Sequence, residues 1–276
     1  MNITHKIIPL LFFFIVSHLR AQQQEDLVNL MYGKNKQQTL DLFLPKTYTT
    51  STPVLVMLHG GAWSMGGKEY THKTSKDLRN RGFIVANIDY RYVSETVHAK
   101  DLLQDIDSAV VYLQKIAAEK GFNTGQFNIA GISAGAHLAL LYAYTSNRNI
   151  KSISALCAPS KFDDAKTFKH IEKLGLVKTI SFLADDTYSA NKLSSRFTDI
   201  SPYQRVKQLP TLIIHGTKDD LVDYQQSADL YKKLQEKKIK SKLVTMDGKG
   251  HDVGMNQPDS EVKVLDAITN WIKTYN

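Results

Sequence analysis

The serine at position 133 has the sequence context of a nucleophile. Residues 131–135 read Gly-Ile-Ser-Ala-Gly, with an apolar run before them and a helical pattern after them. A serine between glycines at such a junction is typical of a strained strand-to-helix turn that exposes the hydroxyl above a helix N-terminus. The chemistry predicted for Ser133 is nucleophilic acyl transfer. The alternative interpretation is an ordinary glycine-bounded turn.

A second motif can supply the electrostatic partner of such a nucleophile. Residues 59–63 read His-Gly-Gly-Ala-Trp and follow an apolar run. Acyl transfer needs backbone N–H groups aimed at the oxyanion that develops on the substrate carbonyl. Small residues let the backbone approach that oxygen, so Gly61 and Ala62 can supply two donors. The N–H of Ala134, directly after the serine, can supply a third.

Two further motifs contain a carboxylate and a histidine. Residues 215–222 read His-Gly-Thr-Lys-Asp-Asp-Leu-Val, and they place Asp219 or Asp220 in a loop after another apolar run. His251 ends a glycine-rich stretch shortly before a C-terminal helical pattern. A serine hydrolase uses a carboxylate to orient its histidine base. The chain order serine, aspartate, histidine is the one expected when all three meet at one edge of a parallel sheet.

The elements that would position these groups follow from hydrophobic periodicity. Residues 40–44 alternate apolar and polar, as a half-exposed strand does. Further strands are predicted over residues 54–58, 83–88, 127–132, 153–158, 212–214 and 243–246. Apolar residues at helical spacing predict helices over residues 102–116, 134–143 and 264–272. Strands that alternate with helices predict an α/β fold with a mainly parallel central sheet and helices on both faces.

One long segment interrupts this rhythm. Residues 159–209 combine weak helical patterns with polar turns, and this is too long for a simple connection in a compact domain. We interpret the segment as a lid inserted into a single domain of residues 22–276. Its side chains, together with Trp63, are expected to shape the substrate pocket.

The N-terminus resembles an export signal. Residues 7–16 form an uncharged apolar stretch after Lys6, and Ala21 precedes a possible cleavage point. Such a stretch is too short to span a bilayer and suits a signal peptide. We therefore predict a signal peptide over residues 1–21 and a mature protein in the periplasm or outside the cell. The alternative is a buried N-terminal helix.

Composition excludes several classes of protein. The chain has 276 residues, a formal net charge of +8 and a single cysteine, Cys157, which cannot form an internal disulfide and is expected to be a buried core thiol. Six lysines over residues 232–242 fit a solvated helix end, and no motif for nucleic-acid binding accompanies them. The sequence contains neither a His-Glu-x-x-His motif nor clustered cysteine and histidine ligands, so no metal or organic cofactor is predicted.

These motifs together resemble the α/β-hydrolase superfamily. The sequence is similar to its hormone-sensitive-lipase-like carboxylesterases and to bacterial bifunctional feruloyl and acetyl-xylan esterases. The similarity extends to the opening strands around residues 38–45, to Asp-Tyr-Arg at residues 89–91 and to Ser-Pro-Tyr at residues 201–203. The chain departs from that pattern at Ala62, at Ile132 directly before the serine and at Ala136 three residues after it.

The resemblance assigns roles to the candidate residues. It implies Ser133 as nucleophile, His251 as base and Asp219, rather than Asp220, as the acid. It also implies an oxyanion hole made by the backbone of three residues, Gly61, Ala62 and Ala134. The expected reaction is ester hydrolysis through an acyl-enzyme. The expected substrates are acetyl or feruloyl esters of carbohydrate, including polysaccharide, or small esters.

Two other functions fit parts of the sequence. The motif at residues 59–63 is also close to that of kynurenine formamidases, which cleave an N-formyl amide. A secreted binding module on an inactive hydrolase fold is the non-enzymatic alternative, although such proteins usually lack a member of the triad.

Overall fold

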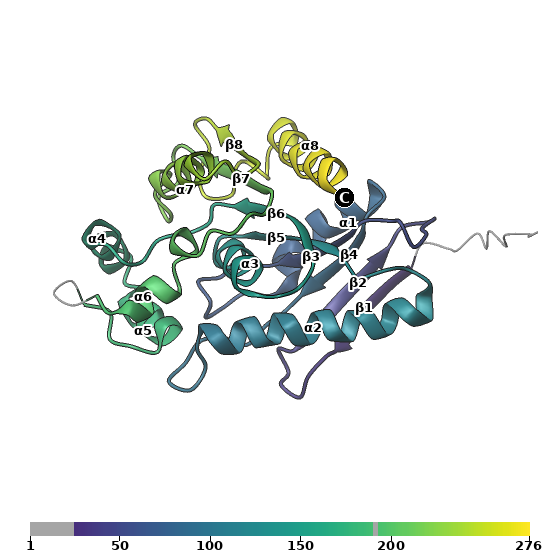
Figure 1. The fold of residues 1–276 in the computed structure, drawn as a ribbon, viewed down its shortest axis with the longest axis horizontal. Coiled ribbons are helices and arrows are strands. Elements are labelled where there is room, and N and C mark those ends of the chain that lie inside the picture. Colours follow the sequence, from purple (N-terminus) through teal and green to yellow (C-terminus); the bar gives the residue numbers. More distant parts are fainter. Residues whose placement is uncertain (1–24, 190–192) are drawn as a thin grey trace, which may run out of the picture.

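An eight-stranded sheet forms the centre of the molecule (Figure 1). The computed structural model describes residues 25–189 and 193–276, so the predicted signal peptide lies outside the described residues. The strands lie in the order β1-β2-β4-β3-β5-β6-β7-β8. Their bounds are β1 (Glu25–Met31), β2 (Thr39–Leu44), β3 (Val54–Leu58), β4 (Ile84–Ile88), β5 (Phe127–Ile132), β6 (Ile150–Leu156), β7 (Thr211–Gly216) and β8 (Ser241–Met246).

The sheet is mainly parallel, as predicted. Strands β3 to β8 pair in parallel, whereas β1 and β2 form an antiparallel extension at one edge. Parallel strands bring their carboxyl ends, and the loops that follow them, to one edge of the sheet. The motifs after β3, β5, β7 and β8 therefore lie at the same edge.

Helices cover both faces of the sheet, which confirms the predicted layers (Figure 1). One face packs against α2 (Ala99–Lys120), α3 (Ala134–Thr145) and α7 (Gln225–Glu236). The other packs against α1 (His72–Asn80) and α8 (Pro258–Tyr275). A short 3₁₀ helix, η1 (Lys68–Thr71), precedes α1.

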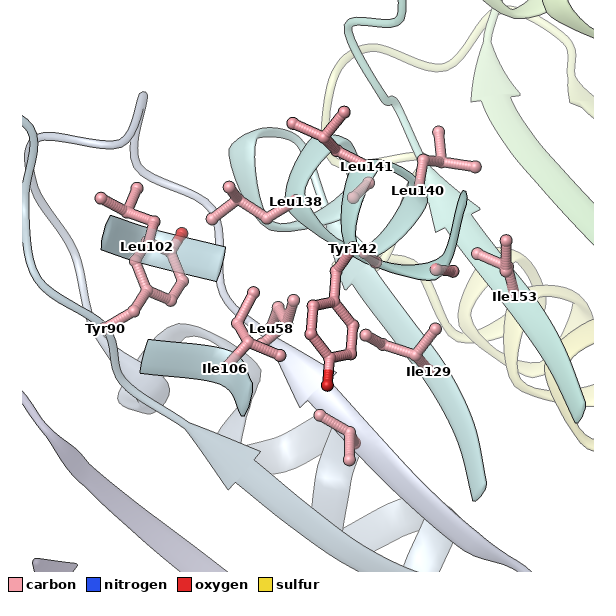
Figure 2. Packing of buried hydrophobic residues seen from close by; sticks show 14 of the residues in the cluster. Leu58, Tyr90, Leu102, Ile106, Ile129, Leu138, Leu140, Leu141, Tyr142 and Ile153 are labelled. Carbon is pink, nitrogen blue, oxygen red and sulfur yellow. The ribbon is translucent and has the colours of Figure 1, made fainter. Parts of the chain in front are cut away.

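The alternation of side chains along the strands divides the core into two clusters. In β3, Val56 and Leu58 belong to the cluster under α2 and α3, whereas Leu55 and Met57 belong to the cluster under α8. Figure 2 shows how side chains of α2 and α3 gather over the strands. Helix α3 is buried nearly all round, as its uniformly apolar sequence predicts.

The pattern along residues 40–44 led to one wrong prediction. Strand β2 is buried along residues 40–44 rather than half-exposed, because β1 covers its outer edge and both faces of the sheet carry helices. Its polar residue, Asp41, is also buried, and the Asn29 backbone N–H donates to its carboxylate at 2.8 Å. The alternation therefore reflects this buried polar contact and not exposure to solvent.

The segment interpreted as a lid contains several short helices. These are α4 (Ala165–Lys173), α5 (Val177–Ala184), α6 (Ser195–Asp199) and the 3₁₀ helix η2 (Pro202–Gln204). Helices α4, α5 and α6 gather at one end of the molecule, to the left in Figure 1. Among the described residues, no helix has both the length and the apolar character needed to cross a bilayer.

Candidate active site

Ser133 lies at a sharp turn between β5 and α3. Its backbone has φ 56° and ψ −122°, a conformation that costs free energy in a non-glycine residue. The Ser133 N–H donates to the Leu156 carbonyl of β6 at 2.7 Å, which helps to hold the turn. Gly135 lets the turn approach β3, because a Cβ at this position would lie 2.3 Å from the His59 carbonyl oxygen. Ser133 is thus fixed beside the loop that follows β3.

The loop after β3 is also strained, and it offers backbone donors. Ala62 and Trp63 have φ values of 46° and 57°. Within residues 25–189 and 193–276, no hydrogen bond uses the backbone N–H of Gly61, Ala62 or Ala134 as donor. Ala134 is the first residue of α3, where backbone N–H groups have no partner within the helix and favour an anion. The arrangement can therefore stabilise a negative oxygen placed next to Ser133.

A buried histidine supports this loop from below. The His59 ring stacks on Tyr90 with centroids 4.3 Å apart, and its Nδ1 donates to the Gly60 carbonyl oxygen at 2.5 Å. Burial lowers the pKa of His59, and the hydrogen bond to the Gly60 carbonyl opposes this effect only in part. The ring is consequently neutral near pH 7. The Tyr90 hydroxyl donates to the His59 carbonyl at 2.7 Å, so both ends of this residue are held.

Asp219 follows β7 and contacts His251, which follows β8. His251 Nδ1 lies 2.7 Å from Asp219 Oδ2, and the other carboxylate oxygen accepts from the N–H groups of Leu221 and Val222 at 2.9 Å each. Burial by itself would raise the pKa of Asp219, but hydrogen bonds from His215, His251 and the Val222 N–H hold it well below its usual range. The side chain is therefore ionised near pH 7.

Of the two aspartates that the sequence pattern allows, the one nearer to β7 makes this contact. Asp220 is exposed, whereas the Asp219 side chain is buried. Gly216 brings the loops after β7 and β8 together, because a Cβ there would lie 2.3 Å from the carbonyl oxygens of Lys249 and Gly250.

A second histidine binds the same carboxylate, and the sequence interpretation gave it no role. His215 is fully buried, and its Nε2 lies 3.0 Å from Asp219 Oδ2. Its Nδ1 lies 2.6 Å from the Ser227 hydroxyl. The His-Gly pair at the end of β7 was the available signal, but a buried histidine in a strand does not reveal its partner.

Cys157 lies close to this pair, as part of a buried group whose ligand atoms fall within 4.8 Å of one another. Burial and the charge of Asp219 raise the pKa of its thiol, so it stays protonated, and a thiol is a poor metal ligand. Asp219 and His215 already satisfy each other. The thiol is buried, as predicted.

The candidate residues meet at one cavity of about 580 Å³. Ser133, His251 and the loop residues Gly61, Ala62 and Trp63 all line it. Asp219 contacts His251, and Ala134 directly follows Ser133. The structure therefore brings together every site residue predicted from the sequence.

The opposite wall of the cavity comes from the segment of residues 159–209 and is largely apolar. The lining side chains of this wall are Phe162, Ile171, Leu174, Leu176 and Ile180. We call these five side chains the lid wall. Helix α4 is amphipathic, with Phe168 and Ile171 buried and its charged residues outward.

The polar side chains that line the cavity are mostly occupied within the protein. The side-chain Oε1 of Gln226 accepts from the backbone N–H groups of Ser160 and Lys161 at 2.9 and 2.8 Å. Thr167 donates from its hydroxyl to Asp164 at 2.9 Å. His170 Nε2 lies 3.1 Å from the Leu221 carbonyl oxygen. A bound group would therefore find more apolar surface than hydrogen-bonding partners on these walls.

Comparison with known proteins agrees with this architecture. The BD-FAE family model matches residues 40–234, which is more than half of the chain and includes both Ser133 and Asp219. A truncated carbohydrate esterase from gut microbiota has the same fold, with a TM-score of 0.74 at 19% identity over 92% of this chain and 98% of that one.

Two curated relatives are longer proteins that this chain matches only in part. A probable isoprenylcysteine alpha-carbonyl methylesterase from Oryza sativa subsp. japonica is 28% identical over 90% of this chain, which spans 63% of that protein. Esterase LipC from Mycobacterium tuberculosis is 24% identical over 75% of this chain and 54% of its own length. This chain thus spans less than two thirds of either relative.

Proposed function

This chain belongs to the BD-FAE family of the α/β-hydrolase superfamily, and we propose that it is a serine carboxylic-ester hydrolase. One observation carries the proposal. The Asp219–His251 pair, at 2.7 Å, and Ser133 converge on a cavity that the strained loop with Gly61 and Ala62 also lines. A carboxylate, an imidazole, a hydroxyl and free backbone donors are the parts that acyl transfer needs.

In the proposed reaction, His251 is the base. Its Nδ1–H donates to Asp219, which leaves Nε2 with the lone pair that accepts the Ser133 proton. The serine oxygen then bonds to the ester carbonyl carbon, and the carbonyl oxygen becomes an anion stabilised by the N–H groups of Gly61, Ala62 and Ala134. When the tetrahedral intermediate collapses, the C–O bond to the alcohol breaks and His251 returns the proton to the leaving oxygen.

Water completes the cycle. It attacks the acyl-enzyme carbonyl while His251 Nε2 takes its proton, and the second tetrahedral intermediate collapses with release of the carboxylic acid. The proton goes back to the Ser133 oxygen. Asp219 keeps its charge throughout, because its hydrogen bonds hold its pKa well below the usual range, and it stabilises the imidazolium that forms in each half.

The acyl group of the substrate is proposed to occupy the apolar cavity. At about 580 Å³ the cavity falls in the range that holds drug-sized ligands, so an acetyl group would leave most of the lid wall without a partner. Of the acyl groups expected from the sequence, this favours feruloyl over acetyl. The isoprenylcysteine in the rice relative's name contains an apolar prenyl chain, which agrees with such a cavity.

A chain-length series tests both levels of the proposal. The protein would be assayed on p-nitrophenyl esters from acetyl to hexanoyl, with Ser133→Ala as the matched control. We expect kcat/KM to rise about fourfold per methylene, because burial of one methylene contributes about 0.8 kcal/mol. Acetate and ferulate release from plant xylan would then be compared.

Other outcomes would redirect the proposal. Turnover that depends on Ser133 but is fastest for acetyl would move the substrate to acetylated carbohydrate or to a small ester. Faster cleavage of an N-formyl aryl amide than of any ester would support the formamidase alternative. A protein that does not react with a fluorophosphonate probe would support the binding module instead.

The proposal also includes export and a single hydrolase domain. The apolar stretch at residues 7–16 supports cleavage after Ala21 and a mature domain of residues 22–276, with residues 159–209 as its lid. Mass spectrometry of the protein secreted by a bacterial host would identify its first residue. An N-terminus other than Gln22 would revise the cleavage site.

A further inference from the structure

His137 connects three segments around the cavity, and the proposed reaction gives it no role. It lies in the first turn of α3, four residues after Ser133, and it is fully buried. The Trp63 indole Nε1–H donates to its Nδ1 at 3.0 Å. Its Nε2 lies 2.7 Å from the carbonyl oxygen of Ile200, where residues 159–209 return toward the sheet.

These two contacts fix the protonation state of the ring. A carbonyl oxygen only accepts, so Nε2 must carry the hydrogen that binds Ile200. The indole N–H only donates, so Nδ1 must offer a lone pair to Trp63. Burial lowers the pKa of His137 to about 4, against the opposing hydrogen bond to Ile200, so the neutral ring is the form present near pH 7.

Aromatic contacts add the third connection. The His137 ring meets Phe162 edge-on at 5.3 Å and Trp63 edge-on at 5.2 Å, and Trp63 meets Phe162 at 5.9 Å. The side chains of Trp63 and Phe162 line the cavity. The histidine therefore supports one cavity residue from the loop after β3 and one from the lid wall.

Both ends of the inserted segment are tied at the same place. The Phe162 N–H donates to the Ser201 hydroxyl at 2.9 Å, and that hydroxyl in turn donates to the Phe197 carbonyl. The Tyr203 N–H donates to the Ser160 carbonyl at 2.9 Å. A displacement of the lid wall would consequently also shift Ile200 and the His137 ring that binds its carbonyl oxygen.

We infer that His137 is a positioning residue that couples the lid wall to the oxyanion loop through the side chain of Trp63. Trp63 directly follows Ala62, and both have positive φ, so the orientation of the indole helps to set the direction of the Ala62 N–H. An acyl group that fills the cavity contacts Trp63 and Phe162. This rigid pair then keeps the Ala62 N–H pointing at the oxyanion. The inference rests on the proposed ester hydrolysis.

Three variants test the two hydrogen bonds of His137 separately. Trp63→Phe keeps an aromatic ring and removes the indole N–H. His137→Gln places a donor near the Nε2 position and loses the acceptor for Trp63. His137→Asn places an acceptor near the Nδ1 position and loses the donor for Ile200. Tyr142→Phe is the matched control, because it removes one hydrogen bond of α3, from the Tyr142 hydroxyl to Asp107, within the cluster of Figure 2.

The measurement is kcat and KM on p-nitrophenyl hexanoate, with active sites counted by fluorophosphonate titration. We expect Trp63→Phe and His137→Gln each to lower kcat per active site at least tenfold, since removal of a whole oxyanion donor costs about 10² to 10³. The double variant Trp63→Phe/His137→Gln should lose no more kcat than either single variant, because both substitutions remove the same hydrogen bond. His137→Asn should retain more activity, and the control should keep the kcat of the unmodified protein.

The opposite results are equally clear. If the variants keep the unmodified kcat per titrated site, or if the two single losses multiply in the double variant, His137 is only a satisfied core histidine. Counting active sites removes any effect of partial unfolding. If the unmodified protein neither reacts with the probe nor cleaves the ester, the proposed function fails and the coupling loses its premise.

Discussion

The two walls of the cavity are built differently. The wall at the sheet edge is made of strained backbone and short hydrogen bonds, with positive φ at Ser133, Ala62 and Trp63. The lid wall is made of apolar side chains on short helices, among which Leu174 and Leu176 are partly exposed. Geometry at the first wall is determined by the parallel strands, whereas volume at the second depends on side-chain size. We therefore expect changes at the sheet edge to abolish turnover and changes at the lid wall to alter selectivity.

Removing the nucleophile should have the largest effect. Ser133→Ala deletes the hydroxyl and leaves the turn in place, so the fold should persist while kcat on p-nitrophenyl hexanoate falls by about 10⁶. Circular dichroism would confirm that the variant is folded. Residual turnover above about 1% would show that another group attacks the ester.

The carboxylate pair gives the next largest contrast. Asp219→Asn should lower kcat by about 10⁴, because an amide cannot hold the His251 tautomer or stabilise the imidazolium. Asp220→Asn changes an exposed neighbour and should leave kcat nearly unchanged. Steady-state kinetics of both variants would decide the matter, and equal losses would contradict the assignment of the acid.

His137, which contacts residues of both walls, predicts a dependence of stability on pH. The pKa of His137 is about 4 in the folded protein, and an unfolded histidine has about 6.5. Between these values the unfolded chain binds the proton more readily, so the free energy of unfolding should fall as pH falls from about 6.5 to 4. The contribution is about 3 kcal/mol and is fully present above about pH 6.5.

Urea unfolding at pH 7 and pH 4.5 measures this contribution. His137→Gln removes the titrating group, and other groups contribute equally to both proteins. The variant should therefore lose less stability than the unmodified protein over this interval. An identical loss in the two proteins would mean that folding does not lower the pKa of His137.

A change at the lid wall should have the smallest effect, and it should alter selectivity between esters rather than abolish turnover. Leu174→Trp adds volume to the apolar wall, so it should lower kcat/KM for the hexanoyl ester about tenfold and leave the acetyl ester within about twofold. Glu172→Trp places the same side chain on the exposed face of α4 as a control. Equal loss on both esters would mean that the change disturbs the sheet edge as well.

Strand periodicity, motif spacing and the family resemblance predicted most of the sheet and the candidate residues Ser133, Asp219 and His251, which lie at one edge of it. The runs at residues 54–58 and 127–132 match β3 and β5 to the residue. Strand β1 and helix α1 were missed, because the first is exposed or half-buried along its whole length and the second has a strongly polar sequence. Their stability comes from packing, which local patterns do not report.

The supporting residues of the site were beyond reach for a similar reason. The partners of His137 are Trp63 and Ile200, which lie 74 and 63 residues away in the chain and meet it only when the strands are in order. His215 contacts Asp219 and Ser227, which are near in the chain but come from the loop and helix that follow β7. Both histidines lie inside or next to a recognised motif, but residue type alone does not distinguish a support from a surface side chain. The identity of the lid wall was likewise set by the fold of α4, α5 and the loops beside them.

The position of β8 has a consequence for how the proposed activity would be lost. This strand is the last in the sheet order and half-exposed, and His251 follows it, whereas Ser133 follows the central β5. Local opening at a sheet edge requires less free energy than global unfolding. Detachment of β8 would remove the base from the cavity while the core around α3 stays folded. Inactivation on mild heating should then precede loss of the fold, with early hydrogen exchange confined to this edge.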